Sequence, residues 1–123
     1  MPRQLQFALL LCLLAWSASA ASHAIITASK PRHGAILKHA PQTATLHFNS
    51  KIERSVTQIV LQTVAGEETV LAAIPGKDIT SMTVKLPGLS PGVFRVVYRV
   101  LSADGHVTEG YVQFTLLKAE SAQ

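Results

Sequence analysis

Two residues near the C-terminal end of the sequence, Asp104 and His106, have the types and the spacing of metal ligands. They flank Gly105 in the stretch SADGHVTEG. In an extended segment, residues two positions apart point to the same side, so the carboxylate and the imidazole would reach one common point. The motif is weak by itself, because Asp-Gly is also a frequent turn dipeptide and a surface histidine beside it needs no metal. A metal role for this pair therefore depends on further donors.

A third candidate donor, His23, follows a segment typical of a secretory leader. Arg3 precedes an apolar run over residues 7–16, and small residues fill positions 17–22. This order is that of a signal peptide. A membrane-spanning helix needs about 20 apolar residues, roughly twice the length of this run. We therefore expect residues 1–22 to be removed on export, with an uncleaved membrane anchor as the alternative.

The cleavage point decides what chemistry the new N-terminus offers. Small residues at −3 and −1 direct cleavage, and cuts after Ala20, Ala21 and Ser22 all satisfy that pattern. A cut after Ser22 puts a free amine on His23, whose amine and imidazole can then chelate one metal ion together. A cut after Ala20 leaves Ala-Ser-His, which forms a separate Cu(II) chelate without donors from elsewhere in the chain. The leader alone slightly favours Ala20, whereas the Asp-Gly-His motif favours His23 as the first residue.

The donor types favour Cu(II). The leader contains Cys12, and the rest of the sequence has no cysteine and one methionine, Met82. Nitrogen and oxygen donors in a tetragonal arrangement suit Cu(II) or Ni(II), whereas soft sulfur ligands select Cu(I). His23 as first residue, with Asp104 and His106, supplies three nitrogens and one oxygen, a set that tetragonal Cu(II) prefers. The terminal amine has a reference pKa of about 8, so binding would release protons and depend on pH.

The elements that position these residues are expected to be strands. In the run 93–101, Phe94, Val96, Tyr98 and Val100 occupy one face. Similar runs with turn residues between them span 44–48, 56–64, 69–74, 81–86 and 111–117. This pattern predicts an all-β Greek-key β-sandwich of about seven strands. The segment between Pro31 and Pro41 is expected to be a loop that crosses between the sheets.

The domain organisation follows from the leader and the strand pattern. We expect a signal peptide at 1–22, one domain at 23–118 and a tail at 119–123. Of the 11 Lys and Arg residues only Arg3 lies in the leader, so 10 remain against 7 acidic residues. The basic residues are dispersed along the chain and aromatic residues are few, which argues against nucleic-acid binding. We expect a monomer.

The sequence resembles the CopC family of exported bacterial copper-binding and copper-resistance proteins. The resemblance rests on the histidine after the leader, on SKPRHGAILKHAPQTATLHFN and on YRVLSADGHVTEGYVQFTL. The resemblance covers residues 23–117. The last of these motifs is specific to the family, whereas the middle of the sequence mostly shows the alternating pattern of β-sandwich strands. The family fold is a small Greek-key β-sandwich, also called cupredoxin-like or immunoglobulin-like. The resemblance implies one Cu(II) per chain, held by the amine and imidazole of His23 and by Asp104 and His106.

The sequence departs from the family pattern at two places. Many members add a Met-rich Cu(I) site, which Met82 alone does not make, so the chain resembles the Cu(II)-only members. Relatives often continue Phe-Ser-Glu where Phe48 is followed here by Asn49 and Ser50. Ser50 thus replaces a glutamate that supports the copper site, and such a loss would weaken affinity about tenfold or more. Glu53 would take the place of this supporting glutamate only if the loop after Ser50 turned back toward the copper site.

The remaining histidines are interpreted as surface residues. His47 lies on the polar face of its strand, opposite Leu46 and Phe48. His39 is likewise interpreted as a surface residue. For His33 a second, weak metal site is the alternative to a solvated loop position.

The resemblance implies a periplasmic Cu(II)-binding protein, not an enzyme, that buffers or delivers copper in homeostasis or resistance. Such domains often work beside an inner-membrane copper transporter. A copper-dependent oxidative enzyme for polysaccharides would need a broad flat face with aromatic residues, and most of the aromatic residues here alternate into the expected core. A metal-free immunoglobulin-like interaction module, in which Asp-Gly-His is only a turn, is the other alternative.

Overall fold

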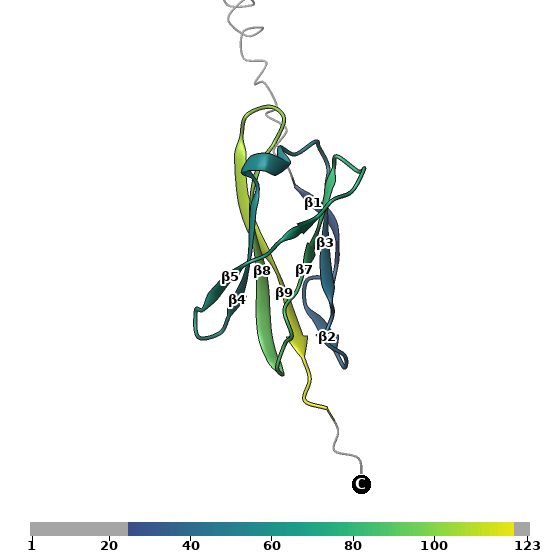
Figure 1. Ribbon diagram of the computed structural model, residues 1–123, viewed down its shortest axis with the longest axis vertical. Coiled ribbons are helices and arrows are strands. Elements are labelled where there is room, and N and C mark those ends of the chain that lie inside the picture. The colour runs from purple at the N-terminus through teal and green to yellow at the C-terminus, as the bar shows by residue number, and fades with distance from the viewer. Residues whose placement is uncertain (1–24, 120–123) are drawn as a thin grey trace, which may run out of the picture.

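The computed structural model describes residues 25–119, so His23 lies outside the described residues. Within this range the chain forms two sheets (Figure 1). The four-stranded sheet has the order β1 (Ile26–Lys30), β3 (Thr43–Phe48), β7 (Ser81–Lys85) and β6 (Ala73–Ile74). The five-stranded sheet has the order β2 (Ala35–Leu37), β9 (Val107–Leu116), β8 (Gly92–Leu101), β4 (Gln58–Thr63) and β5 (Glu68–Val70). A 3₁₀ turn, η1 (Arg54–Val56), precedes β4.

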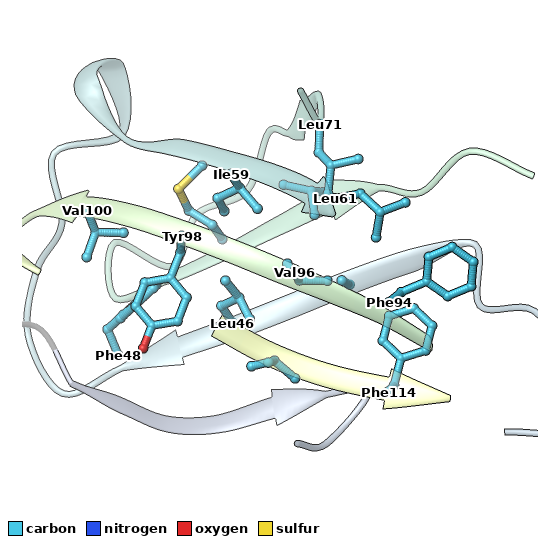
Figure 2. Close-up of a cluster of buried hydrophobic side chains, with 14 of the residues drawn as sticks. Leu46, Phe48, Ile59, Leu61, Leu71, Phe94, Val96, Tyr98, Val100 and Phe114 are labelled. Carbon is cyan, nitrogen blue, oxygen red and sulfur yellow. The ribbon is translucent and has the colours of Figure 1, made fainter. Parts of the chain in front are cut away.

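The two sheets pack face to face around the side chains that alternation assigned to the core (Figure 2). Leu46 and Phe48 of β3 are buried, as are all four apolar residues of the inward face of β8: Phe94, Val96, Tyr98 and Val100. The Phe48 and Tyr98 rings meet edge to face with centroids 5.6 Å apart. The expected all-β sandwich is therefore confirmed. Among residues 25–119, no helix is long and apolar enough to cross a membrane.

Two details differ from the expectation. The segment between Pro31 and Pro41 is not only a loop, because it contains β2, which pairs parallel to β9 with Ala35 opposite Phe114. The run 69–74 divides between two sheets, with β5 on β4 and β6 on β7. The described part thus has nine strands instead of about seven. β2, β5 and β6 are only two or three residues long, too short for period-two alternation to show in the sequence.

The long hairpin of β8 and β9 carries the Asp-Gly-His motif at its tip. The two strands pair in continuous register from Gly92 opposite Leu116 to Leu101 opposite Val107. Gly110 lies opposite Tyr98, and a Cβ atom at Gly110 would lie 2.6 Å from Cζ of the Tyr98 ring. The missing side chain therefore lets the tyrosine ring lie against β9. This pairing fixes where the hairpin tip, residues 102–106, emerges at one end of the sandwich.

Candidate metal centre

The hairpin tip is a tight turn, not the extended segment that the two-residue spacing assumed. The His106 carbonyl accepts a hydrogen bond from the Ser102 N–H at 2.9 Å, and the Ser102 carbonyl accepts one from the Gly105 N–H at 2.9 Å. Gly105 has a φ of 87°, in the left-handed region where side chains with a Cβ are strained. Glycine at this position therefore allows the chain to turn between the two candidate ligands.

The turn brings Asp104 and His106 together, as the motif predicted. Asp104 Oδ2 lies 3.1 Å from His106 Nδ1, and the two side chains are 28% and 48% exposed. The other carboxylate oxygen, Oδ1, accepts hydrogen bonds from the His106 N–H at 3.2 Å and from the Ser102 hydroxyl. An imidazole nitrogen and a carboxylate oxygen thus lie side by side within reach of solvent.

The surroundings of Asp104 favour its charged form. The hydrogen bond from the Ser102 hydroxyl is the largest cause that lowers the pKa of Asp104 below its usual value. Partial desolvation opposes this shift, while the backbone and side chain of His106 lower the pKa further. Asp104 is therefore a carboxylate at neutral pH, the form in which it binds metal ions.

The described chain begins just before β1, at the same end of the sandwich as the loop between β8 and β9 (Figure 1). Ile25 N–H donates to Asn49 Oδ1, and Asn49 N–H donates to the Ile25 carbonyl, both at 2.9 Å. Two residues further on, the Lys51 carbonyl accepts a hydrogen bond of 3.1 Å from the N–H of Ala103, the neighbour of Asp104. The segment 49–51 therefore links the start of the described chain to the hairpin tip.

The described residues supply two of the three predicted ligand residues. Within residues 25–119, no three His, Cys, Asp or Glu residues form a group that could hold a metal ion. The third, His23, lies outside the described residues, two positions before Ile25. Two residues of extended chain span at most about 7 Å. The tie at Ile25 therefore limits how far from Asn49 the His23 backbone can lie.

The two residues considered in place of the supporting glutamate have different surroundings. Ser50 Oγ is buried and has no hydrogen-bond partner among the described residues. Glu53 is exposed and directly precedes η1. Its N–H donates to Leu101 O at 2.8 Å and its carbonyl accepts from Thr57 Oγ1 at 2.7 Å. Glu53 forms no three-residue ligand group with Asp104 and His106 in the described range.

The other described histidines and the methionine lie outside the candidate site, either at the surface or in the core. Nδ1 of the exposed His33 accepts a hydrogen bond of 3.1 Å from the Gln113 N–H, so that lone pair is used within the fold. His39 and His47 are exposed, as expected. Met82 is 6% exposed and belongs to the core.

Two residues that bear on the site were not identified from the sequence. Asn49 holds Ile25, and the Ser102 hydroxyl holds Asp104. Ser102 carried a usable signal, because serine two positions before aspartate in a turn often bonds locally to backbone and side chains. Asn49 carried none, since its partner lies 24 residues away.

Comparisons with known proteins place the chain among copper proteins. The family model described as the CopC domain matches residues 26–117. The chain is 32% identical over 115 residues to the copper transport protein CutJ of Bacillus subtilis, which covers 91% of this chain but 21% of that protein. The chain therefore spans about a fifth of the length of this relative.

Solved structures share the fold. The crystal structure of CopC from Methylosinus trichosporium OB3b superposes with a TM-score of 0.75 at 27% identity, covering 82% of this chain and all of that one. PcoC, a methionine-rich copper resistance protein from Escherichia coli, gives a TM-score of 0.65 at 26% identity, covering 77% of this chain and 99% of that one.

Proposed function

The chain belongs to the CopC family, and on that premise we propose that it is an exported protein that binds one Cu(II) ion and buffers or delivers it. The ligands in this proposal are the amine and imidazole of His23, the Asp104 carboxylate and the His106 imidazole. Copper is the cargo of the protein, and no reaction is catalysed.

One observation carries the proposal: Asp104 Oδ2 and His106 Nδ1 lie 3.1 Å apart at a solvent-accessible turn. Nitrogen and oxygen ligands lie about 2.0–2.2 Å from a metal ion of this size, so two ligands at a right angle are about 3 Å apart. The two donors therefore have the separation of neighbouring ligands in a tetragonal site.

The position of Ile25 supports His23 as the other half of the site. Ile25 is fixed at the end of the sandwich that carries Asp104, and His23 precedes it by two residues. Cleavage after Ser22 would make the His23 amine available as a donor. In this proposal residues 1–22 are the signal peptide, 23–118 the copper-binding domain and 119–123 a tail.

The sulfur content supports Cu(II) over Cu(I). Met82 is the only sulfur-containing residue after the leader, and its place in the core keeps the thioether away from solvent. The described residues thus offer no accessible soft ligand of the kind that selects Cu(I). This differs from PcoC, which is described as methionine-rich.

The distribution of aromatic residues supports a binding protein over an oxidative enzyme. Of the Phe and Tyr residues in the described part, four are buried: Phe48, Phe94, Tyr98 and Phe114. Tyr111 alone is strongly exposed, at 45%. A flat aromatic platform for a polysaccharide is therefore not present on the described surface.

Export to the periplasm and exchange of copper with an inner-membrane transporter complete the proposal. The leader at residues 1–22 supports export. The relative CutJ is a copper transport protein, which supports exchange of copper with a transporter. A monomer suffices, because each chain contains all of the proposed ligands.

A Cu(II) titration of the domain that starts at His23, followed by visible absorbance, tests the proposal. We expect a weak d–d band that saturates at one equivalent. Asp104→Ala and His106→Ala should each abolish this tight endpoint. His39→Ala is the matched control, because His39 is exposed beside Leu117 and Lys118, away from the hairpin tip. Unchanged endpoints in both ligand variants would reject the proposal.

A further inference from the structure

Ser102 occupies an unusual place for a small polar residue. It follows the last residue of β8 and is 1% exposed, and within residues 25–119 it is the one buried polar or charged residue. A buried hydroxyl is costly unless it is hydrogen-bonded. What Ser102 bonds to therefore indicates why a polar side chain is kept there.

The Ser102 hydroxyl lies between two acceptors. It contacts Asp104 Oδ1 and lies 3.0 Å from the His106 carbonyl oxygen. A hydroxyl has one proton, and neither an ionised carboxylate nor a carbonyl can donate. Asp104 Oδ1 is the nearer of the two acceptors and belongs to a charged group. The hydroxyl proton is therefore directed to Asp104, where it makes a charge-assisted hydrogen bond.

This bond determines which carboxylate oxygen faces the histidine. Oδ1 of Asp104 is held by the Ser102 hydroxyl and by the His106 N–H at 3.2 Å. Oδ2 is thereby left on the side of His106 Nδ1, 3.1 Å away. Without the hydroxyl, Oδ1 keeps only the hydrogen bond from the His106 N–H, and the carboxylate is less restrained in its rotation about the bond to Cβ.

We propose that Ser102 is a positioning residue of the copper site, whose hydroxyl holds Asp104 Oδ1 so that Oδ2 is presented to the ion beside His106. This inference rests on the proposed function, because it assigns Ser102 a role in the affinity of that same site. Ser102 does not itself touch the ion, and its effect passes through Asp104.

Another buried hydroxyl provides a matched control. Thr108 Oγ1 is buried without a hydrogen-bond partner in the described part of the chain. Thr108 lies on β9 opposite Val100, two residues past His106. Removal of this hydroxyl alters buried polarity near the tip without removing a bond to Asp104.

The test compares Ser102→Ala with Thr108→Val by Cu(II) competition titration, on variants shown by circular dichroism to be folded. The loss of a side chain that orients a ligand costs roughly 10- to 100-fold in metal affinity. We expect a loss of this size for Ser102→Ala, with a shifted d–d band, and no more than about a twofold change for Thr108→Val. An equal loss in both variants would show a general effect of buried polarity and would overturn the proposal.

A double-mutant cycle separates positioning from a structural role in the turn. If Ser102 acts through Asp104, Ser102→Ala should cause no further loss of copper affinity in an Asp104→Ala background. An equal loss in both backgrounds would contradict the inference. Asp104→Ala also distinguishes the two proposals. Wild-type affinity in that variant would reject the copper site itself, whereas loss in Asp104→Ala without loss in Ser102→Ala would reject only the role of Ser102.

Discussion

Ile25 and Asn49 hold each other through two hydrogen bonds of 2.9 Å, one from the Ile25 N–H to Asn49 Oδ1 and one from the Asn49 N–H to the Ile25 carbonyl. The first bond uses a side chain where a sheet would normally use a backbone carbonyl. It extends the pairing of β1 with β3 beyond Ile26 opposite Phe48. The chain is thereby fixed two residues after His23.

Removal of the Asn49 side-chain amide should break one of the two hydrogen bonds of this tie, and the looser tie should weaken copper binding. In Asn49→Ala the Ile25 N–H loses its acceptor, and the loss of such an orienting contact costs roughly 10-fold in affinity. Asn49→Asp is the matched control, because its carboxylate still offers an oxygen at the same place. Cu(II) competition titration of the domain starting at His23 measures the difference. Wild-type affinity in Asn49→Ala would show that this tie does not position the N-terminal ligand.

Gly110 should be intolerant of a side chain, since a Cβ atom there would lie 2.6 Å from Tyr98 Cζ. Forcing atoms into a packed position costs about 1–3 kcal/mol, so Gly110→Ala should lower the free energy of unfolding by that amount. Gly88→Ala is the control, because a Cβ atom at Gly88 meets no heavy atom within 4 Å. Urea unfolding of both variants measures the effect. Equal stability of the two variants would mean that the packing of the Tyr98 ring does not require glycine at position 110.

Asp78 should make the stability of the fold depend on pH in the acid range. Hydrogen bonds from the backbone N–H and the hydroxyl of Thr80, at 2.9 and 2.7 Å, lower the pKa of Asp78 below its usual value of 3.8. His47 lowers the pKa further through its charge. The unfolded chain therefore takes up the proton at a higher pH than the folded chain. The stabilisation by the carboxylate is complete above the unfolded pKa and is lost as the pH falls through the folded value.

Asp78→Asn, which carries no titratable group at this position, provides the measurement. Thermal unfolding of wild type and variant should differ most near neutral pH, and the difference should shrink between about pH 5 and about pH 2. A gap in melting temperature that stays constant across this range would contradict the assignment.

The inward face of each long strand could be predicted from the sequence, because it depends on a local pattern. Phe94, Val96, Tyr98 and Val100 are buried as their alternation indicated. β2 could not be predicted in this way. Its three residues become a strand only because β9, more than 70 residues later, offers them an edge, with Ala35 opposite Phe114. Such pairing depends on tertiary contacts and not on local propensity.

The candidate site shows the same division. Asp104 and His106 could be found from their types and spacing, and the structure brings them within 3.1 Å. The assumption of an extended segment was wrong, since a turn at Gly105 makes the approach. Asn49 was missed because its hydrogen bond joins residues 24 positions apart, which composition and spacing do not reveal. Ser102 was missed although its position two residues before Asp104 offered a local signal. The roles of His23, Asp104 and His106 as copper ligands remain predictions.

The most direct test of the account is the Cu(II) affinity of the domain that begins at His23, compared with the same domain extended by Ser22. The extension moves the free amine by one residue and leaves Asp104 and His106 unchanged. If the His23 amine and imidazole chelate the ion together, the extended protein should bind more weakly, by more than the roughly 10- to 100-fold typical of supporting residues. Equal affinity of the two proteins would contradict the proposed N-terminal ligand.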